Sequence, residues 1–198
     1  KMVLWGAHDA VMSLNREPEY PSDKAEIEDF FQSAVRDLCY RAESRDITLH
    51  LQHLPGESFY GVDTSSPDDP ALNLLRHPVK WHGTASAMVR FVSQIDAPNL
   101  RYALNTGHAT MYGQTLAEAM ESIMESDAEL GCILLNASLT DGIGQSYDAH
   151  HPVVDSGLDL SPLRPLANDG LMIFDAQYDG WDDIYRDVRA VETALGPV

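Results

Sequence analysis

Segments with strand and helix patterns alternate along almost the whole chain, and this alternation limits the folds that the chain can adopt. Apolar runs typical of strands lie near residues 2–5, 47–52, 100–105, 132–139 and 171–176. Strict alternation of strands and helices predicts a parallel α/β sheet with right-handed crossovers. A closed eight-stranded barrel needs about 250 residues. The alternatives are an open doubly wound sheet, or the last five strand-helix units of a (β/α)8 TIM barrel.

The helices are predicted from apolar residues spaced three and four positions apart. Asp23 with Glu26, and Thr115 with Glu118, have the spacing of capping boxes. The helices are expected over 23–42, 84–95, 115–124 and 181–195, with a short helical or irregular segment over 160–167. The inward face of the first helix is expected to carry Ile27, Phe30, Phe31, Ala34, Val35, Leu38, Cys39 and Ala42, and that of the last Trp181, Ile184, Tyr185, Val188, Val191 and Leu195.

A single domain over residues 1–198 is expected, because a chain of this length with 44% apolar residues suffices for one core. The segment from Gly6 to Tyr20 has the composition of a loop. The Pro-, Gly- and Asp-rich stretch from Pro55 to about Gly83 is too long for an ordinary connection and indicates a functional loop, such as a lid over a barrel mouth. No apolar run approaches a membrane span and no signal-peptide pattern opens the chain, so a cytoplasmic location is expected.

The acidic character of the chain argues against a nucleic-acid partner. There are 31 acidic and 13 basic residues, a formal net charge of −18, and the sequence contains no basic patch. A phosphate backbone would be repelled by such a surface. Cys39 and Cys132 are expected to be two buried thiols rather than a disulfide pair.

Polar side chains follow the ends of several predicted strands. Gln52, Asn105, Ser138 and Asp175 each lie at a strand end, where parallel α/β folds collect their functional groups. Two strings stand out: Asn105-Thr106-Gly107-His108 directly after a strand, and Asp148-Ala149-His150-His151-Pro152 in the loop expected after the next one. Carboxylates and imidazoles gathered there are suited to metal binding and to acid-base chemistry.

These strings, in this order and strand context, resemble the xylose-isomerase-like TIM-barrel superfamily of sugar isomerases, epimerases, dehydratases and apurinic endonucleases. The matching stretches are Leu51-Gln52-His53, Asn105 to His108, Ser138-Leu139-Thr140-Asp141, Asp148 to Pro152 with Gly157-Leu158-Asp159, and Phe174-Asp175. The resemblance covers the chain from Asp23 onward. It implies a barrel whose first three strand-helix units precede the sequence.

The chain departs from the pattern at the four positions that the resemblance assigns to metal ligands. The family carries a Glu, an Asp, a His and a Glu there, and this chain carries Gln52, Asn105, Ser138 and Asp175. Neutral amides bind divalent ions less tightly than carboxylates, so the usual site for Mn, Mg, Co or Zn is predicted to be weakened or lost. The remaining candidate ligands are Asp175, His108, Asp148 and His150.

The resemblance implies an isomerase or epimerase that acts on a small polyhydroxylated carbonyl compound, with a lyase reaction as a variant. The predicted catalytic residues are His108, His150, Asp148 and Asp175. The predicted substrate-binding residues are Gln52, Asn105, Ser138, Trp5 and His82. His50 and His53 are expected to be structural, and capping of the final helix is an alternative use for Asp179, in the loop after Asp175.

The alternative is a non-catalytic sugar-binding or scaffold protein that kept the barrel and lost the ligands. An endonuclease is disfavoured, because its metal cluster and positive surface have no counterpart in the sequence. The expected partner is therefore a sugar-like small molecule, with no nucleic acid and no membrane. An open five-stranded sheet would expose two edges, so a chain of this length alone is expected to form a homo-oligomer.

Overall fold

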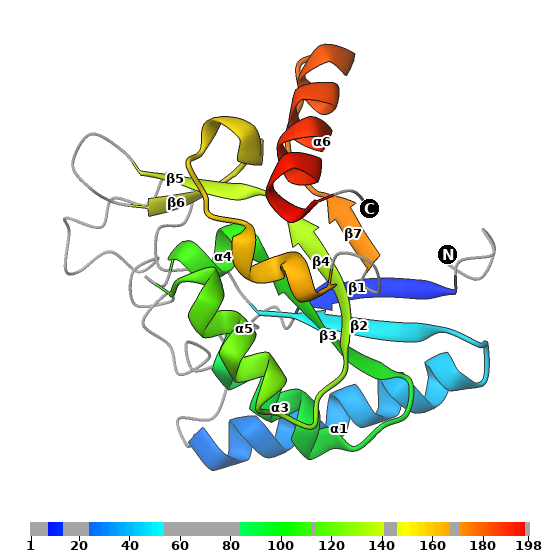
Figure 1. Ribbon diagram of the computed structural model, residues 1–198. Coiled ribbons are helices and arrows are strands. Elements are labelled where there is room, and N and C mark those ends of the chain that lie inside the picture. Colours follow the sequence, from blue (N-terminus) through cyan, green and yellow to red (C-terminus); the bar gives the residue numbers. More distant parts are fainter. Residues whose placement is uncertain are drawn as a thin grey trace, which may run out of the picture.

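The computed structural model describes residues 8–13, 24–53, 84–111, 114–140, 146–166 and 171–196. Its centre is a five-stranded parallel sheet with strand order β1-β2-β3-β4-β7 (Figure 1). The strands are β1 (Asp9–Ser13), β2 (Thr48–Gln52), β3 (Leu100–Asn105), β4 (Leu130–Leu135) and β7 (Leu171–Phe174). Neighbours in the sheet follow one another around it as in an open segment of a barrel, so the predicted parallel arrangement is confirmed.

Helices cover one face of this sheet. α1 (Lys24–Glu43), α3 (Ala85–Ile95) and α5 (Leu116–Met124) lie on the same side of it, and α6 (Trp181–Leu195) follows β7 (Figure 1). A short helix, α4 (Thr106–Met111), follows β3 directly, and the 3-10 turns η3 (Val153–Asp155) and η4 (Ser161–Leu166) lie between the last two strands of the chain. None of the helices in the described part of the chain is long and apolar enough to span a bilayer.

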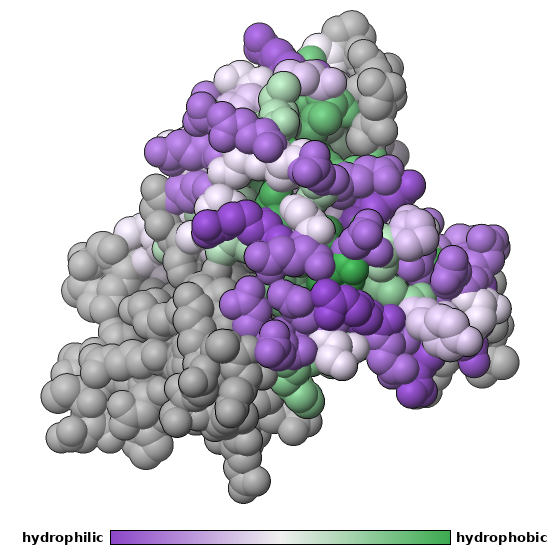
Figure 2. Space-filling view, turned by 90° about the horizontal axis from the view of Figure 1, so that it is seen from below, coloured by the Kyte–Doolittle hydropathy of each residue, from purple (hydrophilic) through white to green (hydrophobic). Residues whose placement is uncertain are grey.

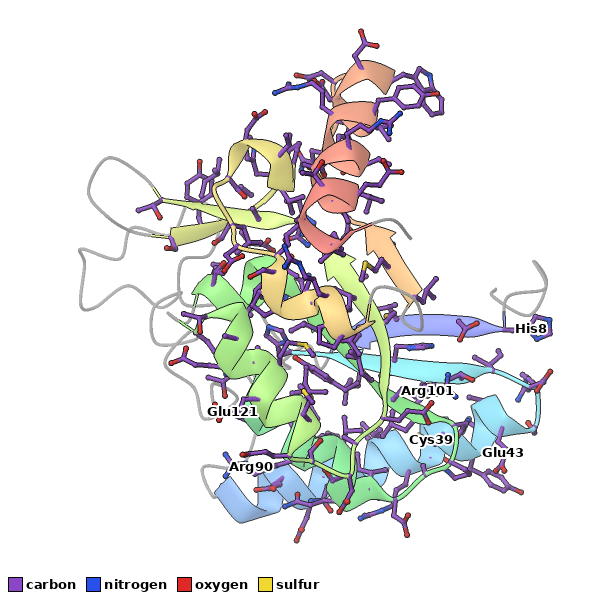
Figure 3. All side chains as sticks on the ribbon, viewed as in Figure 1. His8, Cys39, Glu43, Arg90, Arg101 and Glu121 are labelled. Atoms are coloured by element: carbon purple, nitrogen blue, oxygen red, sulfur yellow. The ribbon has the colours of Figure 1, made fainter. Side chains whose placement is uncertain are left out.

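The core lies between the sheet and the helices. Alternate strand residues point into it, and they meet apolar side chains of α1, α3 and α5. Its largest fully buried apolar members are Tyr102, Phe91, Leu51, Met88, Leu104, Ile133, Leu135 and Leu163. Cys39 lies on the sheet side of α1, while Arg90 and Glu121 are exposed (Figure 3). Hydrophilic residues dominate the described surface seen from below (Figure 2).

The predicted helices over 84–95 and 115–124 are confirmed at their starts. Thr84 is the N-cap of α3, and Thr115 and Glu118 form the predicted capping box of α5. α1 is also confirmed, although Asp23 lies outside the described residues. Both cysteines are buried and free, as predicted.

The expected loop from Gly6 to Tyr20 is wrong at Asp9–Ser13, which forms edge strand β1; the strand expected at 2–5 lies outside the described residues. β1 has a weak sequence pattern, and contacts with its neighbour hold it. β1 pairs with β2 in parallel register, and Asp9 Oδ1 lies 2.8 Å from Nε2 of the buried His50 in β2. Pairing across the sheet therefore decides this element, and local propensity does not.

The segment after β4 also differs from the prediction. In place of one strand over 132–139 and a loop, β4 ends at Leu135 and an antiparallel hairpin of β5 (Ala137–Thr140) and β6 (Ser146–His151) follows. Thr106 breaks the strand, because its Oγ1 pairs with both the N–H (3.1 Å) and the carbonyl (2.5 Å) of Asn136.

The inward face predicted for the last helix is partly wrong. Trp181 and Tyr185 are exposed, whereas Val191 and Leu195 are buried as predicted. The buried residue in the first half of α6 is Asp187, which hydrogen-bonds to neighbouring segments. Phe30 and Leu38 of α1 are exposed as well. In both helices the apolar face is wider than the surface against which it packs. The apolar residues at the edges of that face therefore stay exposed to solvent.

Candidate functional site

A string of hydrogen-bonded polar side chains joins the carboxyl ends of four strands. Asn105, at the end of β3, donates through Nδ2 to Gln52 Oε1 at the end of β2 (3.2 Å). Asn136, just after β4, donates through Nδ2 to Asn105 Oδ1 (3.1 Å) and to Asp175 Oδ2 just after β7 (3.4 Å). The string therefore crosses the sheet at the edge where the sequence predicted the functional groups.

One backbone group fixes the direction of these amides. The N–H of His108 donates to Asn105 Oδ1 (3.0 Å), so that atom must be the oxygen of the amide. The other atom of the Asn105 amide is then the nitrogen, which requires Gln52 to present its oxygen. Asn105 also serves as the capping side chain at the start of α4, because a β-strand end and a helix start meet there.

Three of the predicted catalytic residues converge next to this string. Asp148 Oδ2 lies 3.2 Å from His108 Nε2 and 3.4 Å from His150 Nε2. One ligand atom of each residue lies within 4.8 Å of the others. The His108 and Asp148 side chains are largely buried, at 6% and 11% exposed, while that of His150 is 28% exposed.

Both imidazoles are fixed from behind by main-chain carbonyls. His108 Nδ1 lies 2.9 Å from the carbonyl of His53, and His150 Nδ1 lies 2.8 Å from the carbonyl of Asp175. A carbonyl only accepts, so each Nδ1 carries the proton, and each neutral ring would turn a lone pair of Nε2 toward the Asp148 carboxylate. That arrangement needs positive charge, supplied by protons on the rings or by a cation among the three ligand atoms.

The contacts of His150 and Asp148 shift the pKa values of both side chains. Partial burial alone would lower the pKa of His150, but its bond to the Asp175 carbonyl and the charges of Asp148 and Asp175 outweigh burial and raise it. Burial alone would raise the pKa of Asp148, but the bonds and charges of His108 and His150 hold it below its usual value. The metal-free site therefore favours an ion pair of imidazolium and carboxylate.

Close packing of α4 on β4 fixes His108 in place. A Cβ on Gly107 would lie 2.0 Å from Asn136 Oδ1, so only glycine allows the two segments to approach this closely. His150 has a positive φ of 44°, uncommon for a residue with a side chain. Its main-chain oxygen accepts from Gln177 N–H (2.7 Å), and together with the Asp175 contact this bond holds the strained conformation.

His53 supports the site from the core side. Its carbonyl holds His108, and its Nδ1 lies 2.8 Å from the Tyr102 hydroxyl. Both rings are fully buried, and His53 Nε2 has no hydrogen-bond partner among the described residues. Desolvation, with a smaller effect of His108, lowers the pKa of His53 to about 3. The structural role that the sequence predicted for His53 thus includes fixing a candidate catalytic residue.

Asp187 ties together the segments that follow His150 and Asp175. Its Oδ1 accepts from Val154 N–H (2.7 Å) and its Oδ2 accepts from the Tyr178 hydroxyl (2.6 Å). The Asp187 side chain is fully buried. Desolvation and the Asp187 carboxylate raise the pKa of Tyr178. No sequence signal marked Asp187, because it lies on the expected polar side of a helix.

The other predicted site residues are placed differently. Gln52 and Asn105 lie in the amide string, and Asp175 joins it to His150. Ser138 lies in β5, where its hydroxyl is 2.8 Å from that of Thr110, and Asn136 takes the strand-end place expected for it. Trp5 and His82 lie outside the described residues, as does the stretch from Pro55 to about Gly83 that is expected to form a lid. Asn136 was missed, although a polar residue directly after the buried run Cys132–Leu135 was a usable signal.

The strand ends do not fit a divalent cation. Asn105 Oδ1 already accepts two N–H groups, and Gln52 Oε1 accepts one. Asp175 supplies the single carboxylate of the string, whereas hard cations prefer several charged oxygens. The cluster of His108, Asp148 and His150 does fit such an ion, since two imidazoles held at Nδ1 and one carboxylate are a common ligand set.

No protein-family model matches the chain, and no curated protein matches it. Solved structures match over nearly its whole length. A D-tagatose 3-epimerase-like protein has 18% identity over 98% of this chain and 64% of its own, with a TM-score of 0.68. IolI protein with a bound zinc atom has 12% identity over 98% of this chain and 65% of its own, with a TM-score of 0.66. A xylose isomerase domain protein from Alicyclobacillus acidocaldarius has 14% identity over 96% of this chain and 64% of its own, with a TM-score of 0.59.

The chain therefore spans somewhat less than two thirds of the length of these proteins. The likeness shows that the chain has the fold of a five-stranded part of a TIM barrel. Of the two folds expected from the sequence, the partial barrel is the correct one.

The buried His53 predicts how stability depends on pH. Unfolded His53 takes up a proton below about pH 6.5, whereas the folded residue does so only near pH 3. Because the unfolded state binds more protons in this window, stability falls with falling pH, by up to about 1.4 kcal/mol per pH unit from this group. Denaturant unfolding at several pH values between 6.5 and 4 should therefore show a steeper loss for the native chain than for His53→Leu. Equal slopes would contradict this account.

Removing the Asp187 carboxylate should destabilise the fold around His150. Asp187→Ala leaves a part-buried N–H and a part-buried hydroxyl without this partner, which costs about 2–4 kcal/mol of unfolding free energy. Asp182→Ala, on the exposed start of the same helix, should cost only about 0.5 kcal/mol. Denaturant titration of both variants measures the difference, and a loss of similar size in the two would show that Asp187 holds nothing in place.

Proposed function

We propose that this chain, which has part of the xylose-isomerase-like barrel fold, carries the acid-base groups of a sugar isomerase- or epimerase-like enzyme. The substrate would be a small polyhydroxylated carbonyl compound. The supporting observation is the convergence of His108, Asp148 and His150 beside Asp175 at the carboxyl edge of the sheet. The D-tagatose 3-epimerase-like neighbour is named for the same class of substrate.

The exposed members of the cluster are the ones that can touch a substrate. Asp175 has a side chain 38% exposed and His150 one that is 28% exposed, and Asp175 Oδ2 lies 3.5 Å from His150 Nδ1. Isomerisation and epimerisation both begin with removal of a proton from the carbon next to a carbonyl group. Asp175 is the base in this proposal, because its carboxylate is reachable and is stabilised by His150.

His150 and its partners control the charge next to that base. The contacts of His150 raise its pKa, which favours the protonated ring, and positive charge there would stabilise negative charge that develops on the substrate. Asp148 holds the protonated ring in its orientation, and His108 holds Asp148 from the other side. These two buried residues position His150 rather than meeting the substrate.

The same three side chains would hold one divalent ion. Zinc suits two imidazoles and one carboxylate, and it is the ion named for the IolI neighbour. When bound, the ion would supply positive charge for a substrate oxygen. The residues contribute the ligand atoms, and the carbonyls of His53 and Asp175 fix the two rings in the orientation that such binding requires.

A sugar-binding protein without catalysis is the second candidate. The observation in its favour is that Gln52 and Asn105 bind one another where the resemblance places two metal-binding carboxylates.

Zinc binding is expected to depend on Asp148. Apo protein prepared with a chelator should take up one equivalent of Zn²⁺ in a calorimetric titration, and Asp148→Asn should weaken binding by at least about 10-fold through loss of the charged ligand. Asp155→Asn, an exposed carboxylate on η3, serves as the control and should bind as the native chain does. Binding unaffected by Asp148→Asn would refute the assignment of these ligands.

Proton exchange tests the proposed chemistry directly. In D2O, the native chain should exchange the hydrogens next to the carbonyl of L-erythrulose, a ketose too short to close its ring, and NMR would follow the signal loss. Asp175→Asn should slow the exchange by about 100-fold or more, whereas Asp179→Asn, an exposed neighbour, should not. Binding of the ketose without any exchange would favour the non-catalytic alternative.

A further inference from the structure

Gln52 is the member of the amide string that a ligand can reach. Asn105 and Asn136 are fully buried, whereas Gln52 at the end of β2 is half-buried. Its Oε1 is held by Asn105 Nδ2 at 3.2 Å. Gln52 can therefore offer a ligand its NH2 group, and turning the amide over would place two NH2 groups against each other.

A main-chain N–H fixes the orientation of the Gln52 amide through Asn105. The His108 N–H fixes Asn105 Oδ1, Asn105 Nδ2 then fixes Gln52 Oε1, and the Gln52 NH2 group points away from that contact. A donor held in this way does not need to reorganise when negative charge develops on a bound oxygen. Preorganised amide donors of this kind stabilise oxyanions strongly.

We infer that the Gln52 NH2 group binds the carbonyl oxygen of the substrate and polarises it, at a strand end whose side chains do not fit a cation. The inference rests on the proposed function and names the group that activates the carbonyl. Asn105 is a positioning residue, because it acts through Gln52. Asp175, which accepts from Asn136 at the other end of the string, is the base that takes the proton from the adjacent carbon in this proposal.

The step balances without another reactant. The proton on the carbon next to the carbonyl passes to the Asp175 carboxylate. The electron pair of that C–H bond becomes the carbon-carbon π bond of an enediolate, and the π pair of the carbonyl moves onto its oxygen. That oxygen accepts a hydrogen bond from Gln52 Nε2. In D2O the Asp175 carboxyl exchanges this proton for a deuteron of the solvent, because its side chain is partly exposed. Transfer of the deuteron to carbon reverses the flow of electrons and completes the exchange.

Two variants remove the donor in different ways. Gln52→Met keeps the length of the side chain and has no N–H group. Asn105→Asp keeps an oxygen for the His108 N–H but replaces the Nδ2 donor by a second oxygen, so Gln52 must turn its NH2 group inward and its oxygen toward the ligand. Gln94→Met, at an exposed amide on α3, is the matched control.

The experiment measures binding and exchange with L-erythrulose, and binding of erythritol, which has hydroxyl groups but no carbonyl. The native chain should bind the ketose more tightly than the polyol. Gln52→Met and Asn105→Asp should each remove that preference and slow exchange by about 100-fold, while Gln94→Met changes neither. The double variant should be no slower than either single one, because both variants remove the same hydrogen bond.

Different results would overturn the inference and the proposed function separately. If the native chain exchanges the ketose hydrogens and Gln52→Met does so at the native rate, Gln52 does not polarise the carbonyl, although the proposed function stands. If the native chain prefers the ketose in binding but catalyses no exchange, the proposed function fails, and loss of that preference in both variants still supports the contact. Equal binding of ketose and polyol by the native chain would overturn the inference. Thermal unfolding of each variant confirms that it is folded.

Discussion

A single buried hydrogen bond, from the N–H of His108 to Asn105 Oδ1, determines the arrangement of the candidate site. Asn105 ends β3 and α4 begins at the next residue, so the bond caps that helix and places His108 near Asp148. The same bond fixes which end of the Asn105 amide is oxygen, and thereby orients Gln52 and Asn136. A main-chain N–H can only donate, so the His108 N–H fixes the orientation of the amide string as well as the start of α4 and the position of the His108 ring.

Much of the fold could be predicted because its periodicities are local. Alternating residues in β2 and stripes in α3 and α5 depend on residues near in sequence, and a parallel sheet brings its strand ends to one edge. From that rule alone, the sequence predicts that Gln52, Asn105 and Asp175 lie at the same edge of the sheet. The same rule gave Asp148 and His150 as neighbours of His108, since the strings that contain them follow adjacent strands.

The parts that sequence reasoning missed depend on partners distant in sequence. The run from Cys132 to Leu139 has the pattern of one strand, and it is interrupted because Thr106, thirty positions earlier, binds both main-chain groups of Asn136. β1 exists through its pairing with β2, and Asp187 is buried because Val154 and Tyr178 bring donors to it. Local patterns contain none of these contacts, so no period or propensity could reveal them.

The charged groups and the neutral N–H donors of the candidate site lie at different strand ends, whereas a ring of carboxylates around one ion would bring them to one place. Charge is concentrated where Asp148 and Asp175 flank His150, whereas the neighbouring strand ends carry only neutral amides. In a chain with a net charge of −18, further carboxylates at Gln52 and Asn105 would add repulsion that only a tightly bound cation could offset. Amides remove that dependence and still provide directed N–H groups. In the proposed chemistry the base at Asp175 and the N–H donor at Gln52 are separate groups, so a mutation can remove either one and leave the other in place.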